Sequence, residues 1–487
     1  MSHVNLSKVT TWLHEINSIP TLQVLHLRYT HLPHIAAPLP PFNLTSIATL
    51  DLSGYSSFNT AVLRWFSNAS SLRYLDLAHC DGLHVEPLQA AVGALSNLNG
   101  LCLSSCNIEG DIDGILRNIS SSFNYLDLSS NELTGTIPRA NTLDISNNNI
   151  SGELTDLING LSNCSSGSQV SAILVRNNNL KGIIPSSLGQ LSRLQSLDLS
   201  SNSLQGPIPL SFANATNLYF LSLSNNNINT TLPPFFCNMD SLQVLDLSNN
   251  HLSGEVPNCK SPSLTFLQSL HLNGNDLSGK FPPFLKYCNQ LIILDLGENK
   301  LSGKIPTWVG SNLPLLRFLR LRSNMLHGAI PANIADLEKI GNMKQLESLD
   351  LSINFLIGEI PLSLSTLNFL SYLNLSYNNL SGRIPVSNQF STFNDPAIYV
   401  GNEGLCCTPL PKCSKDAESE ATAADVDKLE RTLYIGSIVM GFIVGFWGSI
   451  GIMILRHGIR IALFQLIDRT CDWIYVQVAV KLKKLKC

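Results

Sequence analysis

Charged side chains recur at one position of a segment that repeats along this 487-residue chain. The segment reads LxxLxL, and in a short strand the residue between its last two Leu residues points away from them. Arg320 occupies that position in one copy, with Arg317 and Arg322 beside it. The position is an acid in most other copies: Asp51, Asp76, Asp127, Asp144, Asp198, Asp246, Asp295 and Asp350.

Two kinds of chemistry fit this arrangement of charges. Neighbouring strands lie about 4.8 Å apart, so Arg320 is predicted to form ion pairs with Asp295 and Asp350. Alternatively, Arg317, Arg320 and Arg322 form a basic patch on a ligand-binding face. Aromatic side chains at outward positions are candidate anchors for the same ligand: Tyr219, Phe220, Tyr372 and Tyr377.

Catalytic chemistry has no motif in this sequence. The chain contains neither a CxxC…CxxC nor an HExxH pattern, and the repeats suggest no catalytic triad. We therefore expect no enzyme activity, no metal and no cofactor. Charged residues make up only 14% of the chain, and the net charge of −4 combines an acidic body with a basic tail. This balance argues against a nucleic-acid partner.

The elements that position these residues come from one pattern, LxxLxLxxNxLxGxIP. A clear copy is LQSLDLSSNSLQGPIP at 194–209, and equivalent positions recur every 24 or 25 residues between Ile173 and Leu319. One turn cannot bury its Leu face alone, whereas stacked turns bury a continuous core. The sequence therefore predicts an α/β-type repeat, a right-handed solenoid of about fifteen turns over residues 22–385 with mostly short parallel strands.

The Asn of each repeat is predicted to be structural. An amide side chain both donates and accepts, so a buried Asn at the bend can satisfy backbone groups of neighbouring turns. The Gly of LxGxIP allows a tight bend, and the Pro ends strand pairing. The expected ladder consists of Asn131, Asn148, Asn178, Asn202, Asn226, Asn250, Asn275, Asn299, Asn324, Asn354 and Asn378.

Residues 433–455 predict one transmembrane helix. These 23 residues carry no charge, and a helix of that length measures about 34 Å, enough to cross a bilayer core of about 30 Å. The basic residues of 456–487 follow it, so the tail is placed in the cytoplasm, in contact with anionic lipid, and the body outside. One face of the helix carries only small residues that would allow another helix to pack closely: Ser437, Gly441, Gly445 and Ser449.

The 24-residue period with LxGxIP resembles the plant-specific class of leucine-rich repeat. The opening NLSKVTTW (5–12) and the end of the repeat region, STFNDPAIYVGNEGLC (391–406), resemble those of the plant receptor-like proteins that include the fungal-xylanase receptors and scab-resistance proteins. The implied organisation is a partial N-terminal flank at 1–21, the solenoid at 22–385, a C-terminal cap at 386–414, an acidic linker at 415–432, the membrane helix at 433–455 and a short basic tail at 456–487.

This resemblance implies a non-enzymatic receptor at the plasma membrane. It implies an extracellular peptide or protein ligand bound on the solenoid, and a membrane-spanning receptor kinase recruited through the acidic linker and the membrane helix, most often in plant defence. Three alternatives stay open: a developmental co-receptor for an endogenous peptide, a wall-associated scaffold that binds enzymes, and a truncated nonfunctional paralogue.

Three departures from the family bear on these alternatives. Met1–Pro20 has no signal-peptide pattern, and the N-terminal cysteine cap of the family is missing. We therefore expect either that the start of the protein is missing from this sequence or that the chain is a truncated relative of an exported protein. The step from Leu126 to Leu143 is only 17 residues. The non-repeat island that related receptors carry near their last repeats is absent from residues 330–349, which puts ligand recognition in doubt.

Several residues are predicted to form disulfides, to carry glycans or to act as a sorting signal. Cys237 and Cys259 are one turn apart and can form a disulfide, while the family implies a second pair, Cys406 and Cys413, with Cys407 where Gly is usual. Tyr475 and Val478 fit an endocytosis signal. Glycosylation sequons lie at Asn5, Asn43, Asn68, Asn118, Asn149, Asn163, Asn214, Asn229, Asn374 and Asn379.

Overall fold

The computed structural model describes residues 2–33, 38–55, 60–116, 123–135, 140–162, 169–259, 264–335, 345–386 and 388–411. These belong to the first of two compact units, Met1–Pro411, and the second unit is Lys412–Cys487. Several sequence predictions fall outside the described residues: the membrane segment, its small-residue face, the linker, the tail, Cys413, Tyr475, Val478, and the sequons at Asn118 and Asn163. No helix among the described residues is long and apolar enough to cross a membrane.

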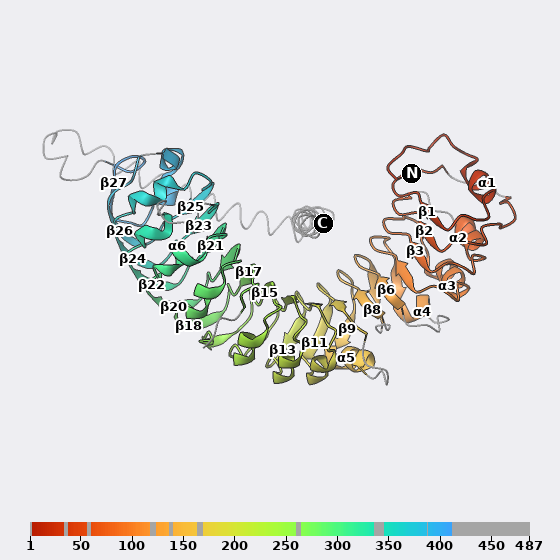
Figure 1. The fold of residues 1–487 in the computed structure, drawn as a ribbon, viewed down its shortest axis with the longest axis horizontal. Coiled ribbons are helices and arrows are strands. Elements are labelled where there is room, and N and C mark those ends of the chain that lie inside the picture. The colour runs from red at the N-terminus through yellow and green to blue at the C-terminus, as the bar shows by residue number, and fades with distance from the viewer. Residues whose placement is uncertain are drawn as a thin grey trace, which may run out of the picture. The chain divides into compact units, whose positions relative to one another are not determined.

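One parallel sheet contains a strand from each turn of the solenoid and lines its inner, concave side (Figure 1). We call it the concave sheet. Its 15 strands run in chain order: β1 (Val24–His26), β2 (Thr49–Asp51), β3 (Tyr74–Asp76), β4 (Gly100–Cys102), β6 (Phe123–Asp127), β8 (Ala140–Asp144), β10 (Ala172–Leu174), β12 (Ser196–Asp198), β14 (Phe220–Ser222), β15 (Val244–Asp246), β17 (Ser269–His271), β19 (Ile293–Asp295), β21 (Phe318–Arg320), β23 (Ser348–Asp350) and β25 (Tyr372–Asn374).

The two irregular steps of the sequence do not interrupt the concave sheet. The short step leaves β6 and β8 directly paired, with Leu126 opposite Leu143. Likewise β21 pairs with β23, so the turns on either side of the position expected for the island are neighbours. Equivalent positions of successive turns therefore stay aligned across both irregularities.

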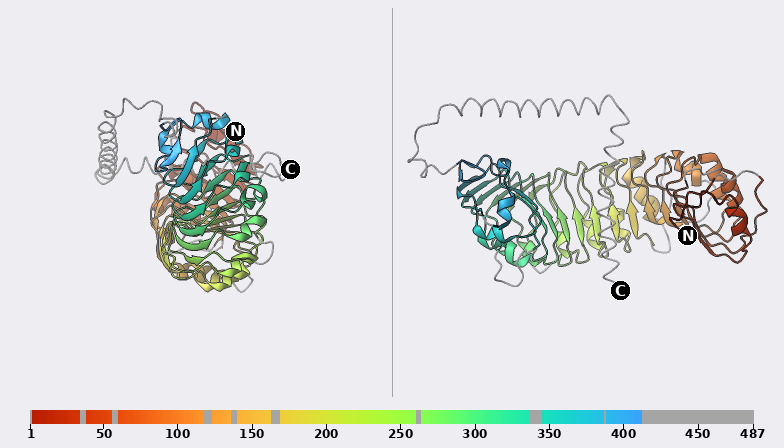
Figure 2. Two further views of the ribbon diagram at one scale, coloured as in Figure 1. Left: turned by 90° about the vertical axis from the view of Figure 1, so that its left-hand side faces the viewer. Right: turned by 90° about the horizontal axis from the view of Figure 1, so that it is seen from above.

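A second set of short strands follows the concave strands and forms smaller parallel sheets (Figure 2). We call the seven-stranded one the lateral sheet: β16 (Ser253–Glu255), β18 (Asp276–Lys280), β20 (Lys300–Gly303), β22 (Met325–Gly328), β24 (Phe355–Gly358), β26 (Asn379–Arg383) and β27 (Gly404–Cys406). The others are β5 (Glu109–Asp111) with β7 (Glu132–Thr134), and β9 (Ser151–Glu153) with β11 (Asn179–Ile183) and β13 (Ser203–Gln205).

The return of most turns is a short helix. In several turns a Pro in extended conformation precedes the helix, as Pro209 does with φ −69° and ψ 142°, so the IP of the repeat ends one element and begins the next. The helices are α1 (Trp12–Asn17), α2 (Thr60–Phe66), α3 (Val85–Gly93), α4 (Ile112–Leu116), α5 (Leu154–Ser162), α6 (Trp308–Asn312), η1 (Ser186–Gln190), η2 (Leu210–Asn214), η3 (Pro234–Asn238), η4 (Pro283–Tyr287), η5 (Ala332–Ala335), η6 (Leu362–Thr366), η7 (Asn388–Thr392) and η8 (Pro396–Ile398).

Leucine fills one continuous core between the concave sheet and the helices. Leu197 and Leu199, which flank an outward Asp, are fully buried, and the same holds in the other regular turns. The bend after each lateral Leu uses a left-handed backbone, as at Gly303 with φ +89°, where a side chain would be strained. The repeating letters thus specify burial and bend together.

The Asn ladder is confirmed in every predicted turn. The Asn299 amide donates to the carbonyl oxygens of Leu272, Leu296 and Gly297 at 2.9–3.3 Å, and its oxygen accepts the Leu277 N–H at 3.0 Å. The pattern recurs from Asn131 to Asn378. These side chains satisfy backbone groups at the bend between the two sheets, so they are structural.

Candidate ligand-binding site on the concave sheet

A hollow of about 560 Å³ lies on the concave sheet over strands β19 to β25. Its lining combines charged and aromatic groups, among them Asp295, Glu298, Phe318, Arg320, Asp350 and Tyr372. The volume is within the range of about 300–1,000 Å³ that is common for small-ligand sites. The part of the solenoid that the sequence marked by its reversed charge is therefore also hollowed.

Strand register brings these side chains together. Arg320 is the partner of Asp295 on β19 and of Asp350 on β23, and Asp350 is in turn the partner of Asn374 on β25. Phe318 and Arg320 flank the buried Leu319, so alternation along the strand directs both away from the core. Residues far apart in sequence thus share one surface because the turns stack in register.

The arginines of this face are paired, and the surface is of mixed charge and not a basic patch. Arg320 Nη1 lies 3.6 Å from Asp295 Oδ2, as predicted. The predicted pair with Asp350 does not form, and one oxygen of that carboxylate accepts the Ser352 N–H and hydroxyl at 3.1 and 2.6 Å. Two further ion pairs were not predicted: Arg317 Nε donates to Glu347 at 2.7 Å and Arg322 Nε to Glu298 at 3.0 Å.

The acids of the concave sheet are less exposed to solvent than their outward position predicts. In several turns the carboxylate accepts the N–H and hydroxyl of the Ser two residues later, as Asp198 does from Ser200 at 3.0 and 2.5 Å. Asp295 accepts the Gly297 N–H at 3.1 Å, and burial raises its pKa although Arg320 opposes the shift. These buried or half-buried carboxylates therefore stabilise the backbone at the end of each strand through hydrogen bonds.

The aromatic candidates separate into two places. Tyr372 is 48% exposed and lines the hollow. Tyr219 and the half-buried Phe220 lie at β14, four strands from β21, which at about 4.8 Å per strand is roughly 19 Å away. Tyr377 is 58% exposed and follows β25 at the corner toward the lateral sheet, with φ +54°. Only Tyr372 belongs to the hollow with Arg320.

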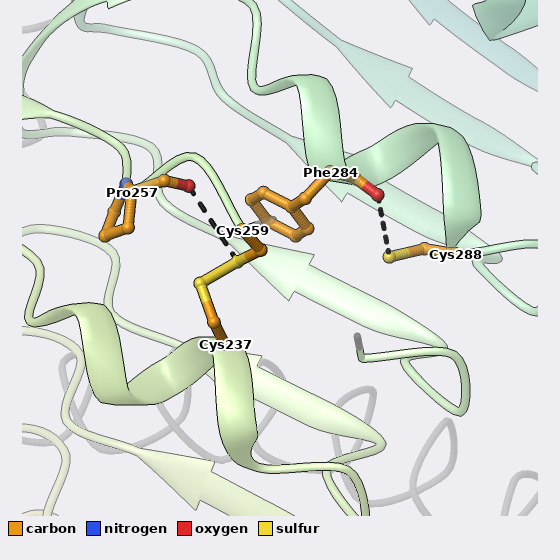
Figure 3. Close-up of a disulfide and its surroundings, with 5 residues drawn as sticks. All are labelled: Cys237, Pro257, Cys259, Phe284 and Cys288. Atoms are coloured by element: carbon orange, nitrogen blue, oxygen red, sulfur yellow. Dashed lines mark hydrogen bonds between the residues drawn. A yellow bond between two sulfur atoms is a disulfide. The ribbon is translucent and has the colours of Figure 1, made fainter. Parts of the chain in front are cut away.

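The structure joins Cys237 and Cys259 in a disulfide across adjacent turns, with Cα atoms 5.4 Å apart. Figure 3 shows the Phe284 ring of the following turn beside it. Cys406 is also disulfide-bonded. Cys407 has φ +75°, a backbone region that favours the Gly usual in the family.

The described sequon residues differ in exposure. Asn374 is half-buried on β25, and its side-chain oxygen accepts from Ser376, so a glycan there would compete with the hollow. The others are exposed: Asn5, Asn43, Asn68, Asn149, Asn214, Asn229 and Asn379.

Sequence reasoning missed several members of the site and scaffold. Asn402 continues the ladder into the cap, where its amide donates to Leu375 and its oxygen accepts from Leu380. Cys80 and Cys106 take the ladder position in two N-terminal turns, and burial raises the pKa of each thiol to about 12. The signal was present, because LxLxxC aligns with LxLxxN. A further hollow near the N-terminus is lined by His3, Asn5, Tyr29 and His31.

No group of three or more His, Cys, Asp or Glu in the described part of the chain is arranged to hold a metal ion. The arrangement supports non-covalent recognition: a concave face with paired charges, an aromatic ring and a rigid backbone behind them. A parallel strand per turn, a buried Leu core and an Asn ladder define the class of leucine-rich-repeat proteins.

Comparison with known proteins agrees with this class. Family models described as Leucine rich repeat match residues 168–228 and, singly, 122–141, 139–164, 290–312 and 369–391, and a model described as Leucine Rich repeats (2 copies) matches 240–287. Receptor-like protein 7 of Arabidopsis thaliana is 31% identical over 206 residues, which is 37% of this chain and 21% of that protein. Polygalacturonase inhibitor 2 of Arabidopsis thaliana is 41% identical over 78 residues, 16% of this chain and 23% of that protein.

A solved structure is similar over most of the solenoid. The Arabidopsis receptor kinase HAESA, in complex with the peptide hormone IDA and the co-receptor SERK1, has 30% identity and a TM-score of 0.63, with 80% of this chain and 67% of that chain covered. The chain belongs to the plant leucine-rich-repeat receptor-like proteins. Its matches span about a fifth of the length of the curated relatives.

Proposed function

We propose that this protein is a cell-surface receptor that binds an extracellular peptide or protein segment in the hollow over β19 to β25 and signals through partner receptor kinases in plant defence. The observation that carries the proposal is the coincidence, in one hollow, of an exposed guanidinium, an exposed aromatic ring and strand-bound acids. HAESA, which is similar in fold, forms a complex with a peptide hormone and a co-receptor.

Arg320 is the group we assign to ligand recognition. Its side chain is 51% exposed, and its contact to Asp295 is long at 3.6 Å. A guanidinium carries five N–H donors and stays charged at all physiological pH values, so a ligand carboxylate can bind it while Asp295 remains nearby. Arg322 is held more closely by Glu298, and its positive charge lies near Arg320 on the same surface.

Apolar contacts complete the proposed ligand contact. Tyr372 offers an exposed ring two strands from Arg320, and Phe318 lies on the same strand as Arg320. Aromatic anchors beside a charged group are common at the energetic centre of recognition surfaces. A ligand with a carboxylate near an apolar side chain fits this geometry best.

Transmission is assigned to residues beyond the described part of the chain. The uncharged segment 433–455 would span the plasma membrane with the N-terminus outside, and Gly441 and Gly445 would pack against the helix of a receptor kinase. The acidic linker 415–432 would dock a basic stretch of the same partner. If Gly441→Leu combined with Gly445→Leu left co-precipitation with the kinase unchanged, this route would be wrong.

A second candidate is a wall-associated protein that binds secreted enzymes without signalling. Its support is the similarity to Polygalacturonase inhibitor 2. The two candidates differ in their need for a membrane partner: the scaffold would retain its function when residues 433–487 are removed, and the receptor would lose its response.

The test uses the full chain expressed behind a secretory leader in leaf tissue, treated with fractionated extracellular extracts, with the oxidative burst as readout. Arg320→Glu with Tyr372→Ala is expected to abolish the response that the unsubstituted chain gives. Leu210→Ser, at a 74% exposed position on helix η2, is the matched control and is expected to respond normally. Equal responses from both variants would refute the hollow as the ligand site.

A further inference from the structure

The lateral sheet has polar side chains at its outward positions in most turns. The outward pairs are Asp276 and Ser278 on β18, Lys300 and Ser302 on β20, and Asn379 and Ser381 on β26, each flanking a buried Leu. Lys300 and Asp276 even form an ion pair at 2.6 Å across two strands. A solvated face is the simplest interpretation of this pattern.

Strand β24 breaks the pattern. Its outward pair is Phe355 and Ile357, which are 63% and 48% exposed, and neither is needed to cover the Leu core. Ile353 and Met325, 51% and 44% exposed, extend the apolar surface toward the preceding turn. We call these four residues the lateral apolar patch. Clustered exposed apolar side chains on a protein surface ordinarily mark a site of contact.

The next strand supplies a candidate cover. Asn379 on β26 is the register partner of Ile357 on β24 and begins the sequon Asn379–Leu380–Ser381. Its side chain is exposed, and among the described residues it makes no hydrogen bond. Neighbouring strands are about 4.8 Å apart and diagonal positions about 7–8 Å, so Ile357 and Phe355 are both within reach of a group attached to Asn379.

We propose that the N-linked glycan of Asn379 folds back onto the lateral apolar patch, with the C–H face of its first sugar on Ile357 and Phe355. A pyranose ring has one apolar face of axial C–H groups, which matches an aliphatic and an aromatic side chain presented flat on a sheet. The glycan is then part of the folded surface and holds an apolar strand in solution. This proposal rests on the extracellular placement in the proposed function.

Other sequons on comparable strands lack this neighbourhood. Asn149 is bonded by the amide of Asn179, and the side-chain oxygen of Asn229 accepts the Gly206 N–H at 3.2 Å. Their flanking strands present Lys181, Ser203 and Gln205, and the exposed Ile183 on β11 is the register partner of Gln205 and of neither Asn. Among these three sequons, Asn379 is the one beside an exposed apolar pair, and Asn229 provides a matched control.

The test is a double-mutant cycle on the full chain, expressed behind a secretory leader in a glycosylating host and recovered from its membranes. Ser381→Ala removes the sequon at Asn379 without changing that Asn, and Phe355→Ser removes the aromatic ring. Ser381→Ala alone is expected to raise the binding of an apolar fluorescent dye about twofold, because the patch becomes exposed. In the Phe355→Ser background the same change is expected to leave dye binding unaltered, and so is Thr231→Ala, which removes the Asn229 sequon.

Glycopeptide mass spectrometry separates the ways in which the proposal can fail. Occupancy at Asn379 with no effect of Ser381→Ala on dye binding would overturn it. A bare Asn379 beside occupied Asn214 and Asn229 would also overturn it and leave the extracellular placement intact. Bare Asn at every sequon of the recovered full chain would overturn the proposal together with that placement.

Discussion

Replacing one ladder Asn by Ala should destabilise the solenoid far more than replacing an exposed Asn outside the ladder. Asn299 bonds four backbone groups: three carbonyl oxygens at 2.9–3.3 Å and the Leu277 N–H at 3.0 Å. Each buried polar group that loses its partner costs about 1–3 kcal/mol, and water entry recovers part of this. Asn299→Ala is therefore expected to lower the free energy of unfolding by about 3–5 kcal/mol.

The assay combines urea denaturation with hydrogen exchange. The Leu277 amide should exchange much faster in Asn299→Ala, because its acceptor is gone. Asn299→Cys should cost less, since Cys106 already fills a ladder position with its thiol 3.0 Å from the Leu77 carbonyl. Asn227→Ala, at an exposed position, is the control and should change stability by less than about 0.5 kcal/mol. A loss below about 1 kcal/mol with the Leu277 amide still protected would refute the reasoning.

Three further predictions concern charge, backbone and cross-link. Burial, and then the neighbouring Asp127, raises the pKa of Asp144 from 3.8 to about 6. The ionised carboxylate therefore lowers the stability of the fold above pH 6, and this cost disappears as the pH falls toward 4. Asp144→Asn should raise the free energy of unfolding by about 2 kcal/mol at pH 7.5 and leave it unchanged at pH 4, as measured by urea titration. Ile353 has φ +54°, a left-handed backbone that is strained for a β-branched residue, whereas several equivalent turns carry Asn or Gly there. Ile353→Asn should therefore add about 1 kcal/mol to the free energy of unfolding, and a loss in urea denaturation would show that packing outweighs strain. Replacing Cys237 and Cys259 by Ser should cost about 3 kcal/mol for a 22-residue loop, and an unchanged melting temperature would contradict this.

The regular part of the fold follows from the sequence because each turn repeats the same physical requirements. Leu197 and Asn202 have equivalents a fixed step away, so burial and bend can be assigned by alignment alone. The ladder positions of Cys80 and Cys106 escaped because the prediction followed the letter Asn and not the position. A thiol can still donate to the same carbonyl.

The charges of the concave face were only partly predictable. The pair of Arg320 with Asp295 follows from register. Asp350 instead bonds the Ser two residues later, and this local contact needs no neighbouring strand. Glu347 stands at the same repeat position as Arg317 in the next turn, so register accounts for that pair too. Glu298 is offset by one position from Arg322, and that pair required the structure.

The hollow and the lateral apolar patch required the structure. A concave volume depends on how turns stack, which single-turn patterns do not describe. Phe355 and Ile357 do break a polar pattern that is visible in the letters, but the partnership of Ile357 with Asn379 depends on the register of β24 and β26. Strain at Ile353 was equally present in the sequence, as an Ile in a position otherwise held by small or polar residues.

Site-specific photocross-linking tests the central claim most directly. A benzophenone amino acid placed at position 372 of the full chain, in tissue that gives the oxidative burst, should form a covalent adduct with the ligand on irradiation. The same group at position 210, on helix η2, should form none. The account predicts an adduct at 372 that disappears with Arg320→Glu; an adduct at 210 instead of 372 would contradict it.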